Sequence, residues 1–276
     1  MPEVIMPNTF RVIWTLTRRE LAVKLSSFWL YGLMSAICLV AALFGGAFIQ
    51  SFDTENVLVS SGPISALNAG IVLFLGLALG IRLTASLVWE REHRTLDVLL
   101  AGPTGHSEII AAKFIAELLV LMLILVIYLL FLIVGQPLGS AVLTLADAGE
   151  IAIWSSFIIP VMAFGLLVSA LFSSVRAAVV AFLVVITFLG IYEGLVIWLA
   201  PLSPTDMSLS MLYLRSGLES VQKATQWLSP VSHICEPVLV YLGRSVSGWT
   251  DILAAVTLGV SFLGISVAVS ARRGIV

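Results

Sequence analysis

Six long apolar runs, each nearly free of charge, constrain this sequence more than any other feature. The hydrocarbon core of a bilayer is about 30 Å thick, and a helix needs about 20 apolar residues to cross it. The chain is 60% hydrophobic and only 11% charged, whereas a soluble domain has about 25% charged residues. The surplus apolar surface must therefore face lipid. The predicted spans are residues 28–49, 66–89, 109–134, 151–172, 177–200 and 252–269.

The basic residues predict which side of the membrane each loop occupies, because cytoplasmic loops are enriched in Lys and Arg. Six spans place both termini on one side. If that side is the cytoplasm, eleven of the 14 bases lie on or toward the inside: Arg11, Arg18, Arg19, Lys24, Arg82, Arg91, Arg94, Lys113, Arg176, Arg272 and Arg273. Only Arg215, Lys223 and Arg244 then lie outside. We therefore expect an all-α, multi-pass membrane protein with both termini cytoplasmic.

Residues 8–26 predict an amphipathic helix ahead of the first span. Its apolar residues recur at helical spacing: Phe10, Ile13, Trp14, Leu21 and Leu25. Its bases lie off that stripe: Arg11, Arg18, Arg19 and Lys24. Such a helix lies in the membrane interface, with its apolar side in lipid and its bases near the headgroups. It serves either as a topology anchor or as a mechanical element.

Residues 201–251, between the last two spans, form the longest extramembrane segment. Pro201 and Pro204 end the preceding helix, and apolar residues at helical spacing follow. We expect one or two short helices on the outer surface, which either dock a partner or seal the outer mouth as lids. The candidates for partner contact are Leu218, Trp227, His233, Glu236 and Arg244.

Three ionisable residues inside the predicted spans are functional candidates, because charge in a bilayer is costly. Arg82 lies near enough to the inner end of its span to reach the headgroups by snorkelling. Glu117 follows Lys113 by one turn, so the two could form an i,i+4 pair. Glu193 has no nearby base in the sequence, which favours a role in a dimer interface or conduit, or a hydrogen-bonded carboxyl at a helix contact. Pro160 predicts a bend at residues 158–162 of the fourth span.

The loop between the second and third spans has the densest charge in the chain: Glu90, Arg91, Glu92, His93, Arg94 and Asp97. An apolar group follows, made of Leu96, Val98, Leu99 and Leu100, and then a Gly-Pro-Thr-Gly turn at 102–105. Ser107 is the expected N-cap of the next helix. The loop predicts a short amphipathic helix in the cytoplasmic interface, with a merely well-capped loop as the alternative.

This loop resembles the corresponding segment of ABC-2 type permeases. The residues that carry the resemblance are Glu90, Arg91, Thr95, Leu96, Leu99, Leu100, Pro103, Glu108 and Lys113. Members of that family often have Gly before the Thr, where this chain has Arg94. The resemblance extends over the whole chain and is strongest to the gliding-motility and nitrous-oxide-reductase-maturation permeases. Within residues 227–273 it rests on Leu228, Ser229, His233, Glu236, Arg244 and Asp251.

The resemblance implies half of an ABC transporter in a bacterial inner membrane, with residues 1–276 as one ABC-2 type transmembrane domain. Such permeases pair as homodimers or with a second permease, and bind two copies of a cytoplasmic ATPase. Residues 90–105 would be the coupling helix, in which Leu96, Leu99 and Leu100 form the buried contact and Glu90, Arg91 and Arg94 its polar rim. Residues 173–176 would be a second contact. The output would be export or a mechanical signal to a periplasmic protein.

The sequence predicts no catalytic, cofactor or metal site in this chain. It has no phosphate-binding Gly-x-x-x-x-Gly-Lys-Ser/Thr motif, so we expect ATP and Mg²⁺ to bind the partner ATPase. His93, His106 and His233 lack metal-ligand spacing. A net charge of −2 argues against nucleic acid as a partner. An ion-coupled secondary transporter of a hydrophobic solute is the alternative, and it predicts several charges near the midplane; a membrane enzyme would need a nucleophile or metal cluster.

Overall fold

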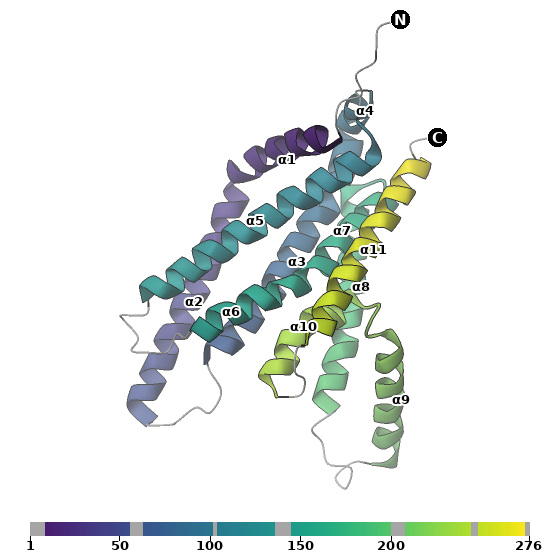
Figure 1. The fold of residues 1–276 in the computed structure, drawn as a ribbon. Coiled ribbons are helices and arrows are strands. Elements are labelled where there is room, and N and C mark those ends of the chain that lie inside the picture. Colours follow the sequence, from purple (N-terminus) through teal and green to yellow (C-terminus); the bar gives the residue numbers. More distant parts are fainter. Residues whose placement is uncertain are drawn as a thin grey trace, which may run out of the picture.

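The computed structural model describes residues 9–55, 63–101, 104–135, 145–199, 208–243 and 248–273, and these are almost wholly helical (Figure 1). The elements are α1 (Thr9–Leu25), α2 (Phe28–Glu55), α3 (Pro63–Glu92), α4 (Thr95–Leu100), α5 (His106–Gly135), α6 (Leu145–Trp154), η2 (Ser155–Phe157), α7 (Ile158–Leu171), α8 (Val175–Leu199), α9 (Leu209–Thr225), α10 (Pro230–Tyr241) and α11 (Trp249–Arg273). The prediction of an all-α membrane protein is confirmed.

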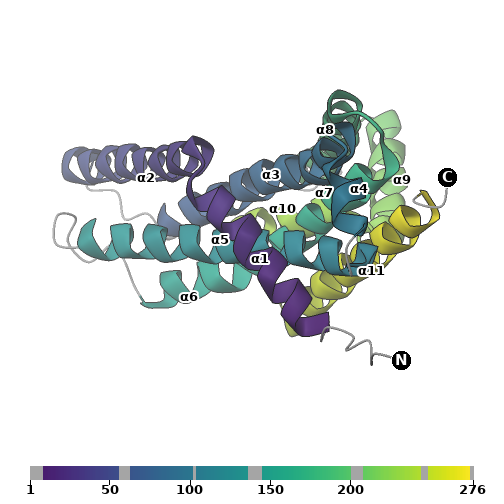
Figure 2. The ribbon, with the colours of Figure 1, turned by 90° about the horizontal axis from the view of Figure 1, so that it is seen from above.

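Five of the six predicted spans correspond to helical segments long and apolar enough to cross a membrane: residues 64–92, 106–134, 149–171, 175–199 and 249–272. The first predicted span lies within α2. Residues 28–44 of α2 follow directly on α1, and the two helices meet at a 64° bend. The sharp bend turns α1 across α5 at one end of the molecule (Figure 2).

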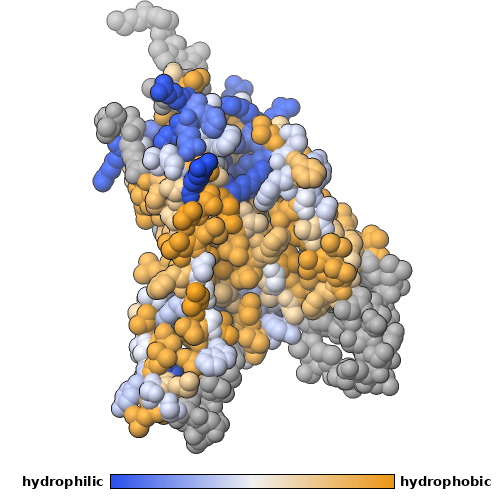
Figure 3. All heavy atoms as spheres, turned by 180° about the vertical axis from the view of Figure 1, so that it is seen from behind, coloured by the Kyte–Doolittle hydropathy of each residue, from blue (hydrophilic) through white to orange (hydrophobic). Residues whose placement is uncertain are grey.

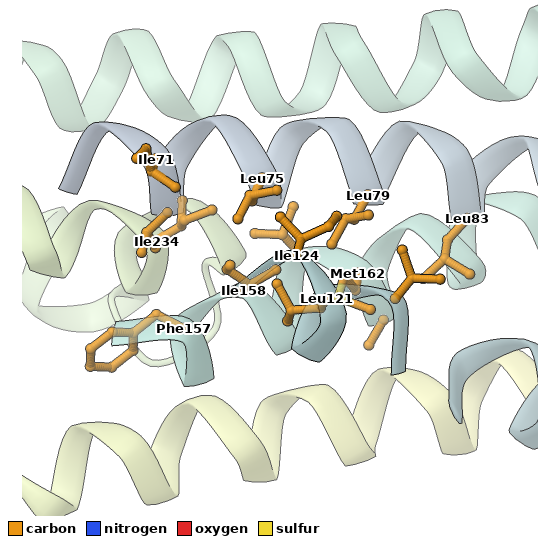
Figure 4. Close-up of a cluster of buried hydrophobic side chains, with 14 of the residues drawn as sticks. Ile71, Leu75, Leu79, Leu83, Leu121, Ile124, Phe157, Ile158, Met162 and Ile234 are labelled. Atoms are coloured by element: carbon orange, nitrogen blue, oxygen red, sulfur yellow. The ribbon is translucent and has the colours of Figure 1, made fainter. Parts of the chain in front are cut away.

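The centre of the fold is the contact between α3 and α7, the most extensive between any two helices. Gly165 lies against the backbone of Gly80, so closely that a Cβ on Gly165 would come within 2.4 Å of the Gly80 carbonyl oxygen. Apolar side chains surround this contact (Figure 4), including Ile71, Leu75, Leu79 and Leu83 of α3, Leu121 and Ile124 of α5, and Ile158 and Met162 of α7. The spacing of four along α3 directs one face into this core.

The irregular part of the fourth span lies one turn before the bend that Pro160 predicts. The 3₁₀ segment η2, Ser155–Phe157, separates α6 from α7. Pro160 has no N–H to donate to the carbonyl of Ser156, and its ring crowds that carbonyl, so the disturbance appears in the preceding turn. The hydroxyls of Ser155 and Ser156 donate to the carbonyls of Ala152 and Ile153, each over 2.7 Å.

The two helices that follow α8 differ in position, and only one is the surface helix that the sequence predicts. α9 has no buried residue. α10 instead packs among α3, α7, α8 and α11, with Val231, Ile234 and Pro237 buried. Ile234 occupies the space that Gly76 leaves on α3 (Figure 4). The surface prediction is therefore wrong for α10, because its apolar side chains match a glycine notch in the bundle.

Polarity divides the molecule along its length. The start of α1, α4 and the end of α11 lie together at one end, here called the α4 end (Figure 1). Hydrophilic side chains gather at that end, above a broad apolar belt over the helices (Figure 3). The candidate site lies at the α4 end.

Candidate functional site at the α4 end

Part of the charged segment that the sequence assigns to the loop between α3 and α5 is in fact the last turn of α3. α3 continues through Glu92, so Glu90 and Arg91 belong to a span, and the helix between the spans is only Thr95–Leu100 rather than 90–105. Arg94 joins them with a φ of 57°, in the left-handed region that favours glycine. The Thr95 hydroxyl donates to the Glu90 carbonyl over 3.1 Å.

α4 is held against its own chain by Leu96. This side chain is only 5% exposed and packs with Leu87, Ile109 and Ala170. Leu99 and Leu100 are partly buried against the same cluster. Leu96 therefore packs inside this chain and fixes the short helix α4 to α3, α5 and α7. Its predicted contact with an ATPase stays a prediction.

The side chains that α4 exposes are not the leucines that the sequence predicts. Val98 is 74% exposed, and Arg94 and Thr95 are also exposed. Pro103 lies outside the described residues. Where α5 begins, the Glu108 carboxylate, rather than Ser107, accepts the hydrogen bond from the Gly105 N–H.

A buried set of charges joins α1, α3 and α5. Lys113 Nζ lies 2.8 Å from Glu90 Oε1 and 3.3 Å from Glu20 Oε1. One turn further, Glu117 is fully buried and pairs with Lys24 of α1. Three acids and three bases therefore occupy this cluster: Glu20, Glu90, Glu117, Lys24, Arg82 and Lys113.

The i,i+4 pair predicted between Lys113 and Glu117 is wrong. Successive turns of α5 direct them to different partners, Lys113 to Glu90 and Glu20, and Glu117 to Lys24 and Arg82. Because α1 lies across α5, it supplies closer opposite charges than the helix itself. Lys24 is likewise turned inward, rather than toward headgroups as predicted.

Arg82 is also drawn inward. Its guanidinium lies 3.7 Å from Glu117 Oε1 and 4.6 Å from the centre of the Trp29 ring. A carboxylate and an aromatic face both attract a guanidinium, so this arginine is held at the junction of α2, α3 and α5. Snorkelling alone does not account for its position.

The second loop at this end is bonded to the first. Arg91 donates to the Phe172 carbonyl over 2.9 Å, and the Val175 N–H donates to Glu92 Oε1 over 2.8 Å. The end of α3, which leads into α4, is thus hydrogen-bonded to residues 172–175. Of the three residues predicted as a polar rim, Glu90 and Arg91 contact their own chain, whereas Arg94 is exposed. Their contact with an ATPase stays a prediction.

The opposite end holds the third intramembrane candidate. Glu193 is buried, and Gln222 of α9 donates to its Oε2 over 3.0 Å. The neighbouring Tyr192 hydroxyl donates to the Leu218 carbonyl over 2.9 Å. Glu193 is therefore a hydrogen-bonded carboxyl at a helix contact, one of the two readings of its sequence position, and it joins α9 to α8.

The predicted outer-partner residues do not share one surface. Trp227 is exposed, Leu218 and Glu236 are half-buried, and Arg244 lies outside the described residues. His233 is buried, and burial lowers the pKa of its imidazole, opposed by the Trp227 backbone and the charge of Asp251. His233 is thus a neutral packing residue of α10 rather than an exposed contact.

Sequence reasoning missed a polar cluster among α3, α5 and α6. The Tyr128 hydroxyl donates to Asn68 Oδ1 over 2.9 Å, and the Ser65 hydroxyl donates to Glu150 Oε2 over 2.9 Å. Asn68 and Tyr128 are almost fully buried. A search restricted to ionisable residues overlooks them, although an Asn within an apolar run is itself a signal of a helix contact.

Two comparisons place these features among known proteins. The family model described as "ABC-2 family transporter protein" matches residues 14–274. The probable ABC transporter permease protein NosY of Pseudomonas aeruginosa is 29% identical over 115 residues, which are 41% of this chain and 41% of NosY.

Proposed function

The chain belongs to the ABC-2 transporter family and is a membrane subunit of an ABC transporter, and we propose that its α4 end docks a separate ABC ATPase. The observation that carries the proposal is the connection of that end to the spans. α4 presents Val98 outward, while Leu96 and the Glu90–Lys113 pair fix the loop to α3 and α5. A movement of α4 would therefore also move α3 and α5, because the loop is fixed to both spans.

The ion cluster extends this connection to α1. Lys113 contacts Glu90 of α3 and Glu20 of α1, and Glu117 contacts Lys24 of α1 and Arg82 of α3. Buried pairs hold a defined geometry, because separating them leaves uncompensated charge. α1, α3, α4 and the first half of α5 would move as one unit when the ATPase closes on ATP.

The complete transporter that we propose has two permease chains, as a homodimer or a paired permease, and two ATPase copies in a bacterial inner membrane. Both termini and the α4 end face the cytoplasm. ATP and Mg²⁺ bind the ATPase. The outcome is export of a substrate or a mechanical signal to a periplasmic protein, for which α9 with its exposed Tyr213 and Leu214 is the available surface.

Co-purification tests the docking proposal. Tagged chain is purified from the cells that naturally produce it, and the ATPase is identified among the bound proteins. Val98→Glu is compared with Val221→Glu, which places the same charge on exposed α9. We expect Val98→Glu to reduce the bound ATPase severalfold and Val221→Glu to leave it unchanged. Equal retention by both variants would contradict docking at α4.

Vesicle transport assays separate the alternatives. ATP-dependent movement of a solute or lipid identifies export, whereas ATP turnover that alters only a bound periplasmic protein identifies mechanical transmission. Ion-driven uptake by the chain without any ATPase would overturn the proposal in favour of a secondary transporter.

A further inference from the structure

α1 presents one kind of charge to its surroundings. Its only acid, Glu20, is turned onto Lys113, and Lys24 is turned onto Glu117. The exposed charges left on the helix are Arg11, Arg18 and Arg19. The inward ion pairs therefore leave α1 with fully exposed charges that are all basic, and Glu20 is only partly exposed.

Two of these bases share a face with an exposed aromatic side chain. Arg11, Trp14 and Arg18 occur at positions i, i+3 and i+7, which lie on one side of a helix. Trp14 is 55% exposed, and Phe10, one turn before it, is 71% exposed. Tryptophan rings favour the headgroup level of a bilayer, and guanidinium groups bind phosphate with paired hydrogen bonds.

The orientation of α1 suits the same surface. The 64° bend before α2 turns α1 away from the direction of the spans, and it lies across α5 at the α4 end, where hydrophilic side chains begin (Figures 2 and 3). A cationic, aromatic helix in that position lies along a membrane surface rather than through it.

We propose that Arg11, Trp14 and Arg18 form a recognition surface for the headgroups of anionic phospholipids, and that its occupancy regulates ATP turnover. The charge complementarity favours anionic lipid over the zwitterionic kind, because each base near such a surface strengthens binding. The regulatory half rests on the proposed function. It follows the contacts from Glu20 to Lys113 at 3.3 Å, from Lys113 to Glu90 at 2.8 Å, and from Glu90 to Thr95 of α4 at 3.1 Å.

Lipid retention tests the surface without any ATPase. The full chain is purified from mixed micelles of equal parts phosphatidylglycerol and phosphatidylcholine, and the ratio of the two lipids retained is measured. R11Q/R18Q is compared with K223Q/R272Q, which removes the same charge from exposed positions outside α1. We expect R11Q/R18Q to lower the retained ratio about tenfold and K223Q/R272Q to leave it near wild type.

Equal loss in both variants, or loss in neither, would overturn the proposed surface. If R11Q/R18Q retains lipid normally but no longer co-purifies with the ATPase, the ATPase and not lipid binds this face. That result would also overturn the proposal. Both variants are checked by gel filtration, so that misfolding is not read as lost binding.

The regulatory half is tested in nanodiscs containing the chain and its ATPase. Replacing phosphatidylglycerol by phosphatidylcholine should change ATP turnover severalfold for wild type, and R11Q/R18Q should remove that dependence. If the ATPase does not bind at all, the docking proposal fails. Lipid retention then still tests whether the surface binds anionic phospholipid. If turnover ignores lipid composition although retention depends on Arg11 and Arg18, regulation through α1 is wrong.

Discussion

The ammonium group of Lys113 lies 2.8 Å from the carboxylate of Glu90, across the contact between α5 and the last turn of α3. This pair stands directly behind α4, because the Glu90 carbonyl accepts the Thr95 hydroxyl. Lys113 also reaches Glu20 on α1. One side chain therefore connects three helices at the proposed ATPase-docking end.

Replacing Lys113 with Met should destabilise the chain strongly. The substitution leaves the buried Glu90 and the half-buried Glu20 without their shared base, and breaking a buried ion pair costs about 3–5 kcal/mol. The double variant K113M/E90Q should be less destabilised than K113M alone. Denaturant titration in detergent measures this, with Lys223→Met on exposed α9 as a control expected to stay within about 0.5 kcal/mol. Equal effects of K113M and K223M would contradict the buried network.

Replacing Arg94 with Gly should stabilise the fold or leave it unchanged. Arg94 has a φ of 57°, and the left-handed conformation costs about 1–2 kcal/mol for a residue with a Cβ. His93→Gly, at a neighbouring position without positive φ, should be destabilising. Thermal unfolding of both variants gives the comparison. A large loss in R94G with none in H93G would show that the backbone is not left-handed there.

Replacing Gly165 with Ala should disturb the central contact between α3 and α7. A Cβ there would lie 2.4 Å from the Gly80 carbonyl oxygen, which is backbone and cannot rotate away. Overpacking of this kind costs about 1–3 kcal/mol. Gly190→Ala is the matched control, because a Cβ at Gly190 on α8 meets nothing within 4 Å. If thermal unfolding shows both variants equally stable, the helices do not approach this closely.

Acid should weaken the packing of α10 through His233. Burial lowers the pKa of this imidazole in the folded chain, whereas its ordinary value is about 6.5. The unfolded chain then binds more protons below that pH, so the stabilisation is complete above about 6.5 and declines as the pH falls further. Unfolding midpoints of wild type and His233→Gln between about pH 8 and 5 should converge on the acidic side. Parallel curves would mean that His233 titrates normally.

The sequence predicts the helices well and the charge partners poorly, for physical reasons. Long apolar runs identify spans because length and hydropathy are local properties. The partner of Glu117 is not local: the bend between α1 and α2 brings Lys24 to it, and no spacing rule on α5 reveals that.

The same distinction explains the loop. Its charged and apolar residues predict a short helix, and α4 is one. Which apolar side chain of α4 faces outward depends on how the helix is rotated against Ile109 and Ala170, and these residues belong to other helices. Amphipathic spacing alone could not tell that Leu96 packs inward and Val98 outward. The depth of α10 likewise depends on the notch at Gly76, on another helix.

The most direct test of the account is a site-specific photo-crosslink from Val98. A photoreactive amino acid at Val98, with the same group at Val221 on α9 as the control, is activated in membranes that contain the ATPase. We predict a crosslinked adduct from position 98 that contains peptides of the ATPase, and no such adduct from position 221. An ATPase adduct from position 221, or none from position 98 while the complex remains assembled, would contradict docking at α4.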